Sequence, residues 1–294
     1  MQREDKKPWR ILDILQLSTQ KLKNERFQNP RLEAEYLLSH TLNLKRIDLY
    51  LSYDRPMSDD EIRRFRNLLK RRLSHEPLQY IIGFTEFMSL PFKVKRDIFI
   101  PRPETEILVE GVIEKLRWVK DRAVKILDVG TGSGNIAISL AYYLKNSFVI
   151  GMDISCEVLE TALKNAELNQ VSGRVKFVAG DMNLPPFTDS AQYDAVVSNP
   201  PYVPENTVAQ LPREIREYEP EYSLKSGKKG LDFFKKISIL FKKLLRKGGY
   251  IFFEIGGDTQ RDTVQKMLEK NGFSEIDHLK DYNNQTRVVY GKNM

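Results

Sequence analysis

The sequence predicts an α/β protein with a doubly wound, mostly parallel sheet, preceded by a small helical domain and a β-hairpin connector. From about residue 104 onward, apolar strand-like segments alternate with amphipathic helix-like segments, which is typical of parallel sheets with helical crossovers. The first 75 residues or so instead show helical periodicity. Residues 84–100 are rich in aromatic and β-branched residues without a helical period, which predicts the hairpin.

In the first part, helices are expected over residues 9–22, 29–42 and 58–73. Asn29 is placed to cap the second of these, with Pro30 at its first position. Ser58 and Glu61 form a capping box at the start of the third. The later turns of that helix are dense in cations, which suit the C-terminal end of a helix dipole: Arg63, Arg64, Arg66, Lys70, Arg71 and Arg72.

In the second part, the prolines on either side of Arg102 precede an acidic stretch from Glu104 that predicts the start of a helix. Further helices are expected over residues 135–145, 157–169, 231–245 and 263–272. Strands are expected over residues 124–130, 148–155, 175–181, 193–201, 250–256 and 286–292.

Composition limits the class of protein. The 294 residues are 41% hydrophobic and 30% charged, as in ordinary soluble proteins, and no apolar run approaches the ~20 residues of a membrane span. The charged first residues argue against a secretory signal. The single cysteine, Cys156, excludes an intramolecular disulfide, and we expect it to be buried or half-buried. The three histidines are scattered, so we expect no metal site. With a single cysteine and no disulfide, we expect the protein to work in the reducing cytoplasm.

Positive charge is concentrated in the first part of the chain. The net charge is +7, and residues 1–83 hold 17 Lys and Arg against 12 Asp and Glu. This excess favours a polyanionic partner, or a partner found on one, but a merely solvated basic surface explains the charge equally well.

A glycine-rich turn follows the first strand of the predicted sheet. In residues 127–135, "LDVGTGSGN", Gly130, Gly132 and Gly134 allow a sharp turn and a close approach to a ligand. Because ligands bind at the carboxyl ends of parallel strands, we expect a site at this edge. The loop alone also fits a loose dinucleotide fingerprint ending at Ala137, or a tight turn without a ligand.

Acidic residues at the next strand ends narrow the choice of ligand. Asp153 ends the second strand, where an acid accepts hydrogen bonds from ribose hydroxyls. Asp128 precedes the glycines, where it would repel a pyrophosphate but help to hold a cation. Asp181 and Met182 follow the third strand, where contacts to adenine are expected. Together they favour S-adenosylmethionine over NAD.

The fourth strand ends in "SNPPYVP", residues 198–204. A planar nitrogen such as an amide has a delocalised lone pair, so fixed acceptors for its N–H bonds help transfer more than a base does. The Asn199 side-chain oxygen and the Pro200 carbonyl are such acceptors. Pro200 and Pro201 stiffen the turn, and Tyr202 offers an aromatic face. Positioning of this kind supplies roughly 7–11 kcal/mol of a barrier.

Together with these motifs, "IPRPETEILVE" and "YEPEYSLKSGKKGLDFF" make the chain resemble the release factor glutamine methyltransferases, the HemK/PrmC family. The resemblance runs from about residue 30 to the C-terminus. It implies a Rossmann-like class I methyltransferase domain with a seven-stranded sheet. It also implies methyl transfer from S-adenosylmethionine, with S-adenosylhomocysteine as product, to the glutamine N5 in the Gly-Gly-Gln motif of class 1 peptide chain release factors.

The resemblance also implies roles for individual residues. The turn Pro101-Arg102-Pro103 would close the methionine end of the pocket. Our own hypothesis is that the basic stretch 61–72 contacts an acidic surface of the release factor. Catalytic roles fall to Asn199, Pro200 and Tyr202, and these three with Pro201 would bind the glutamine. Cofactor-binding residues would be Gly130, Thr131, Gly132, Ser133, Gly134, Asp153, Met182 and Asn199.

The expected division is a substrate-recognition domain over residues 1–83, a linker over 84–100 and a methyltransferase domain over 101–294. We expect a monomer without a membrane or a stable nucleic-acid partner. The main alternative is an N6-adenine methyltransferase acting on DNA or RNA, because an exocyclic amine is also planar with two N–H bonds. A cofactor-binding protein without turnover and an NAD-dependent oxidoreductase are weaker alternatives.

Overall fold

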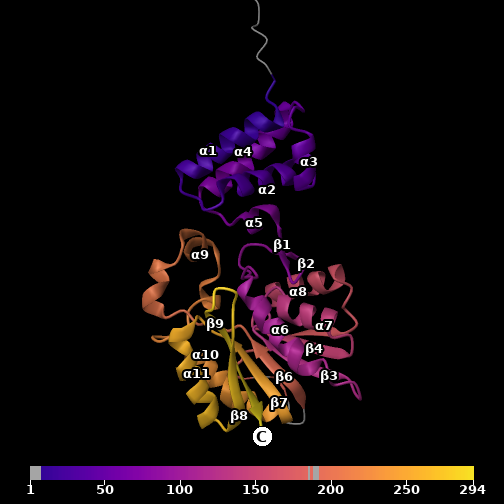
Figure 1. Cartoon of the computed structure of the whole chain (residues 1–294), viewed down its shortest axis with the longest axis vertical. Coiled ribbons are helices and arrows are strands. Elements are labelled where there is room, and N and C mark those ends of the chain that lie inside the picture. Colours follow the sequence, from indigo (N-terminus) through magenta and orange to yellow (C-terminus); the bar gives the residue numbers. More distant parts are fainter. Residues whose placement is uncertain (1–7, 185, 188–191) are drawn as a thin grey trace, which may run out of the picture. The chain divides into compact units, whose positions relative to one another are not determined.

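The computed structural model describes residues 8–184, 186–187 and 192–294 (Figure 1). Residues 1–7, on which the argument against a secretory signal partly rests, lie outside the described residues. The chain divides into two compact units, Met1–Gly83 and Phe84–Met294. The hairpin that was expected to be a separate linker falls in the second unit. The functional division of the chain stays a prediction.

The first unit is helical. The three expected helices are confirmed, and the capping box is present, because the Glu61 amide donates to Ser58 Oγ (3.3 Å) and the Ser58 amide to Glu61 Oε2 (2.9 Å). Two short helices, α3 and α5, were not expected, since each is too short to show a period. The helices are α1 (Ile11–Asn24), α2 (Pro30–Leu42), α3 (Arg46–Leu51), α4 (Asp59–Leu73) and α5 (Leu78–Ile82).

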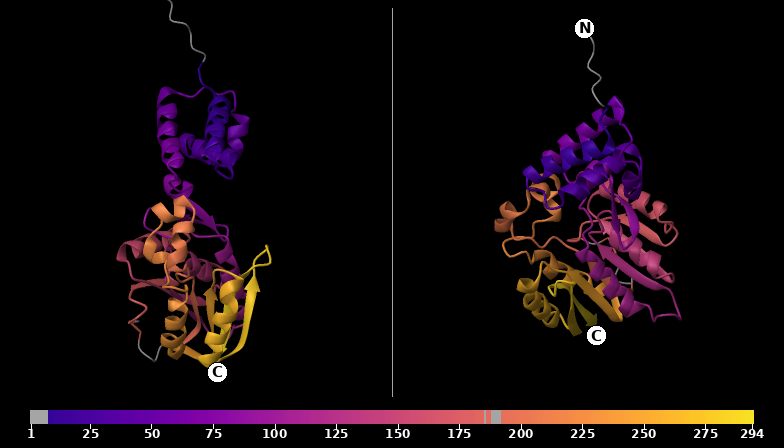
Figure 2. Two further views of the ribbon diagram at one scale, coloured as in Figure 1. Left: turned by 90° about the vertical axis from the view of Figure 1, so that its left-hand side faces the viewer. Right: turned by 45° about the horizontal axis from the view of Figure 1, so that its top comes forward.

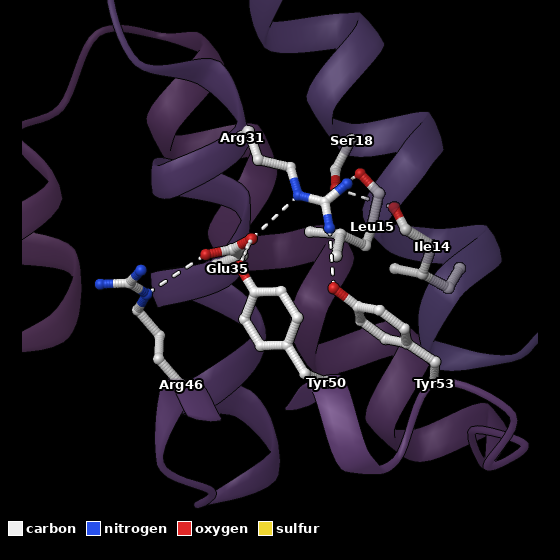
Figure 3. A network of polar contacts seen from close by, with 8 residues as sticks. All are labelled: Ile14, Leu15, Ser18, Arg31, Glu35, Arg46, Tyr50 and Tyr53. Carbon is white, nitrogen blue, oxygen red and sulfur yellow. Dashed lines mark hydrogen bonds and ion pairs between the residues drawn. The ribbon is translucent and has the colours of Figure 1, made fainter. Parts of the chain in front are cut away.

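A buried carboxylate ties α2 to α3 and to the turn beyond it (Figure 3). Glu35 is only 2% exposed and accepts hydrogen bonds from Arg31 Nε (2.9 Å), Arg46 Nε (3.2 Å) and the Tyr50 hydroxyl (2.7 Å). Arg31 also donates to the Tyr53 hydroxyl (2.8 Å). Burial raises the pKa of Glu35, but these hydrogen bonds outweigh it and the net pKa lies below the ordinary value. The carboxylate therefore stays charged and fixes both arginines.

Basic side chains of α4 that the sequence indicated as surface cations are held in ion pairs. Arg72 is 4% exposed and pairs with Glu33 (2.5 Å), while its guanidinium lies 4.2 Å from the centre of the Phe27 ring. Arg71 pairs with Glu76 (2.5 Å). Arg72 is therefore part of the core packing of the first unit and not a surface cation.

The second unit contains a hairpin and a large sheet with helices on both faces (Figures 1 and 2). Its strands are β1 (Phe84–Phe87), β2 (Leu90–Lys93), β3 (Val124–Val129), β4 (Ser147–Asp153), β5 (Val175–Ala179), β6 (Tyr193–Ser198), β7 (Leu245–Glu254), β8 (Phe273–Lys280) and β9 (Thr286–Asn293). Its helices are α6 (Glu104–Leu116), α7 (Asn135–Tyr143), α8 (Cys156–Leu168), α9 (Arg213–Tyr218), α10 (Asp232–Leu240) and α11 (Asp258–Lys270), with 3₁₀ turns η1 (Glu205–Gln210), η2 (Glu221–Ser223) and η3 (Lys242–Leu244).

The sheet has the order β5-β4-β3-β6-β7-β9-β8. The first five strands are mutually parallel, and β9 runs antiparallel to both β7 and β8, which confirms the seven-stranded, mostly parallel sheet. The strand β8 was not expected, because its exposed face makes "FSEIDHLK" polar. The helix expected over residues 231–245 ends earlier, at Leu240, and Leu245 already begins β7.

Alternate residues of the central strands face two apolar cores. Ile126 packs with residues of α6, α7 and α8, whereas Leu127 and Val129 pack with residues of α10 and α11. This period of two in a strand covered on both faces is what a doubly wound fold requires.

The expected hairpin is confirmed, and α8 anchors it beside the carboxyl end of the sheet. The Asn165 side chain accepts from the Lys93 amide (2.7 Å) and donates to the Lys93 carbonyl (3.1 Å). The same amide group donates to the Ser133 carbonyl in the glycine loop (2.9 Å). One buried side chain thus links the hairpin, α8 and the loop.

Replacing Arg72 with alanine should lower the free energy of unfolding of the first unit by about 3 kcal/mol, because Glu33 would lose its partner in a mostly buried setting. Chemical denaturation followed by circular dichroism measures this. The exposed Arg66 lies on the same helix, and Arg66→Ala should change stability by less than about 0.5 kcal/mol. Equal effects of the two substitutions would contradict the buried role of Arg72.

Candidate active site

The glycine loop leaves β3 through three residues with positive φ. These angles are +77° at Gly130, +56° at Gly132 and +82° at Gly134, a region that other residues rarely adopt. A Cβ on Gly134 would also lie 2.9 Å from Ile138 Cδ1. The sequence therefore folds here into a tight turn whose end starts α7.

Asp128 braces this loop from within the protein. It is fully buried, and its Oδ2 accepts a hydrogen bond from Thr131 Oγ1 (2.6 Å). Burial raises its pKa to about 7, although Thr131 and the Ala137 amide lower it. Asp128 is not one of the described residues that line the cavity at this edge of the sheet. The expectation that it helps to hold a cation was therefore wrong, because its side chain turns inward to the loop.

Asp153 ends β4 beside the loop. Its Oδ2 accepts from the Gly132 amide (2.9 Å) and its Oδ1 from the Ser155 amide (3.2 Å). Burial raises its pKa, and these backbone hydrogen bonds lower it. The parallel register pairs Val129 with Met152, so the end of β4 lies next to the start of the loop.

A cavity of about 490 Å³ opens at this edge of the sheet. Most of the residues expected to bind the cofactor or the glutamine line it: Gly130, Thr131, Gly132, Ser133, Asp153, Asp181, Met182, Asn199, Pro200, Pro201 and Tyr202. Gly134 is not among the described lining residues, and a Cβ at this position would meet Ile138, Ala162 and Phe177. Its role is to form the turn.

The turn after β6 is held on the side away from the cavity. Asn199 Nδ2 donates to Thr105 Oγ1 (3.2 Å), and the Tyr202 hydroxyl donates to Glu254 Oε1 (3.3 Å). Burial raises the pKa of the Tyr202 phenol, and the nearby Glu254 raises it further, so the hydroxyl stays protonated. Both side chains therefore have defined partners before any substrate binds.

Gln260 fixes the backbone of the same turn. Its Nε2 donates to the carbonyls of Tyr202 (3.0 Å) and Gly230 (3.2 Å), and its Oε1 accepts from the Gly256 amide (2.9 Å). Sequence reasoning missed this residue, because a glutamine in the first turn of a helix carries no local signal.

Glu254 was also missed. It ends β7, is 1% exposed, and is acidic in an otherwise apolar run, "YIFFEIG". Burial raises its pKa to about 7, whereas the nearby hydroxyls of Thr105 and Tyr202 lower it. The sequence signal that could have identified Glu254 is an acidic residue at the end of an apolar strand.

The turn Pro101-Arg102-Pro103 before α6 contacts a residue that lines the cavity but is not itself part of the described lining. Arg102 pairs with the buried Glu219, and its guanidinium lies 5.2 Å from the centre of the Phe99 ring. Phe99 and Pro220 line the cavity, while Pro101, Arg102 and Pro103 are not among its described lining residues. The expectation that the turn itself closes the pocket is therefore corrected.

The segment after η2 forms another wall. The Val203 amide donates to the Leu224 carbonyl (2.9 Å) and the Ser226 amide to the Val203 carbonyl (3.0 Å). Tyr222, Ser223, Leu224 and Phe233 line the cavity and were not assigned from sequence. Their stretch, "YEPEYSLKSGKKGLDFF", stood out only through the family resemblance.

Cys156 is exposed at the start of α8, so the expectation that it is buried or half-buried was wrong. In the part of the chain that the structure describes, no helix is long and apolar enough to cross a membrane.

Comparison with known proteins identifies the family. Residues 13–83 match the family model described as the PrmC N-terminal domain, and residues 120–289 match a methyltransferase domain model. The release factor glutamine methyltransferase of Chlorobaculum tepidum is 37% identical over 95% of this chain and 96% of its own length. The chain belongs to the release factor glutamine methyltransferases.

Other relatives of the same name agree. The enzyme of Geobacter sulfurreducens is 37% identical, with 97% of each chain covered. That of Fusobacterium nucleatum is 38% identical over 96% of this chain and 78% of its own. The predicted family and enzyme class are confirmed, and these relatives give the adenine alternative no support.

A solved structure supports the fold alone. The catalytic domain of hMettl16, crystallised with an RNA hairpin, has a TM-score of 0.57 at 18% identity and covers 81% of this chain and 83% of that one. The overall fold is therefore shared with a protein of low sequence identity.

Replacing Gly230 with alanine should destabilise the second unit by about 2 kcal/mol, because its φ is +69° and a Cβ would collide with the Tyr202 carbonyl oxygen. Thermal unfolding of the full chain measures this. For the control, a Cβ on Gly173 meets nothing within 4 Å, so Gly173→Ala should be neutral within about 0.5 kcal/mol. A neutral Gly230→Ala would show that the turn is not packed as described.

Proposed function

We propose that this enzyme transfers a methyl group from S-adenosylmethionine to the side-chain amide nitrogen of the glutamine in the Gly-Gly-Gln motif of class 1 release factors. The observation that carries this proposal is the orientation of Asn199. Its Nδ2 is engaged by Thr105, so the oxygen Oδ1 is the group available to a substrate at the cavity. An acceptor in that place suits a substrate that presents N–H bonds.

The residues at the cavity fit S-adenosylmethionine. The Asp153 carboxylate, held at the strand end by the Gly132 amide, suits the ribose hydroxyls. Ile154, Val158 and Met182 give the cavity an apolar side that suits an adenine ring. The turn of Gly130 and Gly132 lets backbone approach the amino-acid part closely. We assign these residues to cofactor binding.

When bound, the cofactor supplies a methyl group on a positively charged sulfur. The transfer forms one N–C bond, breaks one S–C bond and releases one amide hydrogen as a proton. Asn199 Oδ1 and the Pro200 carbonyl accept the two N–H bonds of the glutamine amide and stabilise the positive charge that develops on the nitrogen. The stiff Pro200-Pro201 backbone keeps these acceptors in place, and Tyr202 packs beside the planar amide.

A transfer assay tests the proposal. Methyl-labelled S-adenosylmethionine is incubated with the enzyme and a release factor, or the same factor with Gln→Ala in its Gly-Gly-Gln motif. We expect label on the unaltered factor only. Asn199→Ala should lower kcat by about 10²–10³-fold, the cost of removing one preorganised polar group, while binding of S-adenosylhomocysteine is largely kept.

DNA and RNA are included in the same assay as competing substrates. Label on nucleic acid with none on either release factor would contradict glutamine methylation.

We also propose that the first unit recognises the release factor through an apolar face of α2 and α3. Ile47 and Leu51 lie one turn apart on α3 and are 65% and 83% exposed. On α2, Tyr36 is 40% exposed and carries the Arg46 guanidinium 5.2 Å from its ring centre. Aromatic and arginine side chains held rigid beside exposed apolar groups are typical of protein interfaces.

The Glu35 network supports this face, because Glu35 fixes Arg46, which precedes Ile47 in α3, and also fixes Arg31 (Figure 3). The basic stretch 61–72 is a weaker choice. Arg64 pairs with Asp60 (3.0 Å), Arg71 pairs with Glu76, and Arg72 is buried. A contact of that stretch with substrate stays a prediction.

Replacing both Ile47 and Leu51 with glutamate should raise the KM for the release factor about tenfold and leave kcat unchanged, because binding alone is lost. Steady-state kinetics with varied release factor measure this. Leu17 on α1 is 47% exposed, and Leu17→Glu is the matched control, expected to keep the wild-type KM. An unchanged KM in the double variant would contradict the docking face.

A further inference from the structure

The turn after β6 lines a second cavity besides the one described above. This second cavity also has a volume of about 490 Å³, and Tyr202 and Val203 line both. Its other walls come from η1, from the stretch before α10 and from the first turns of α11, where Thr259 and Thr263 lie. Apart from the contacts of Gln260, nothing in the proposed reaction uses these walls.

The backbone of the shared wall is already engaged. The Val203 amide and carbonyl pair with residues 224–226 (2.9 and 3.0 Å). The Tyr202 carbonyl accepts from Gln260 Nε2 (3.0 Å), and Pro204 has no N–H. A molecule in the second cavity therefore finds its hydrogen-bonding partners mainly among side chains.

Polar side chains in the second cavity are available for this. Lys229, Thr259 and Thr263 are exposed, and in the part of the chain that the structure describes their side chains take part in no hydrogen bond or ion pair. Thr259 and Thr263 are one helical turn apart, so both lie on one face of α11. The Thr207 hydroxyl donates to the Pro204 carbonyl (2.8 Å) and keeps its oxygen as an acceptor.

The chemistry of this lining suits a polypeptide backbone. A peptide group offers one N–H donor and one carbonyl acceptor. Hydroxyls match both, and the Lys229 ammonium matches the carbonyl. Glycine peptide groups have no side chain to shield them, so a glycine-rich segment is best able to reach short threonine hydroxyls. A small anion fits less well, because Asp258 lies in the first turn of α11.

We propose that the second cavity binds the main chain of the release factor beside the target glutamine. This rests on the proposed function, in which the glutamine side chain lies against Tyr202 in the first cavity. The polypeptide that carries the glutamine leaves across the shared wall of Tyr202 and Val203. Its peptide groups then bond to Thr259, Thr263 and Lys229, which holds the glycine-rich segment in register with the glutamine.

The two hydroxyls on α11 give the first test. Thr259→Val/Thr263→Val removes both with little change in shape and should raise the KM for the release factor about tenfold, because each lost hydrogen bond weakens binding several-fold. The kcat and the affinity for S-adenosylhomocysteine should stay near wild type. Thr85→Val on β1 is the matched control, since Thr85 is outside the described lining of both cavities, and it should keep the wild-type KM.

The lysine gives an independent test with a closely matched control. Lys228 and Lys229 are adjacent and both exposed, but of the two only Lys229 is among the described residues that line the second cavity. Lys229→Met should raise the KM for the release factor about fivefold, whereas Lys228→Met, with the same change in net charge, should leave it unchanged. An equal rise in both variants would show a general effect of charge and contradict the inference.

Binding measured without turnover separates the loop from other contacts of the release factor. A fluorescein-labelled peptide of the Gly-Gly-Gln loop is titrated with the full-length enzyme and S-adenosylhomocysteine, and its anisotropy is followed. The Kd of Thr259→Val/Thr263→Val should be about tenfold above that of the wild type and of Thr85→Val. Inorganic phosphate at constant ionic strength should not displace the peptide. Displacement would mark an anion site and overturn the inference.

A wild-type KM in Thr259→Val/Thr263→Val would also overturn the inference. So would a loss of affinity for S-adenosylhomocysteine as large as the rise in KM, since that result means that the shared wall has moved. If the wild-type chain does not methylate the release factor at all, the proposed function fails and the inference fails with it. Transfer by the wild type, together with an unchanged KM in the threonine and lysine variants, contradicts the inference alone.

Discussion

The parallel pairing of β3 with β4 and β6 is the constraint on which the site depends. It pairs Asp128 with Val197 and Val129 with Met152, so three strands end at one edge. Segments far apart in the sequence, such as the glycine loop and the turn at Asn199, therefore face one cavity. The helices on both faces bury the sheet and keep this edge as the accessible one.

Strand pairing brings the groups together, and buried polar contacts then fix their directions. Asn199 is held by Thr105 from α6, and Tyr202 by Glu254 from β7 and Gln260 from α11. The side chains of Asn199, Tyr202 and Gln260 therefore each have a partner that limits their rotation, which is how a site becomes preorganised for charge that develops later. The family's proline turn fits the same pattern, because it starts the helix that carries Thr105.

The sequence predicted the residues that come at strand ends, because apolar runs and glycines mark those positions locally. It did not predict Glu254 or Gln260, whose roles arise from contacts 52 and 58 residues away. For Asp128 and Arg72 the sequence predicted a role at a ligand or at the surface that the structure does not support. Their charge indicated a ligand or a surface, but burial turned each toward a partner inside the protein. A local pattern indicates which face of a strand or helix a side chain takes, but not which partner a buried polar side chain turns toward.

A neutron crystal structure of the enzyme with S-adenosylhomocysteine and a Gly-Gly-Gln peptide would show directly which way the Asn199 amide points, because X-ray data at ordinary resolution do not distinguish the two ends of an amide. We predict hydrogens on the end of Asn199 that faces Thr105, and the glutamine nitrogen within hydrogen-bond distance of Asn199 Oδ1 and the Pro200 carbonyl. Hydrogens on the end of Asn199 that faces the glutamine would contradict the proposed role of Asn199 as an acceptor.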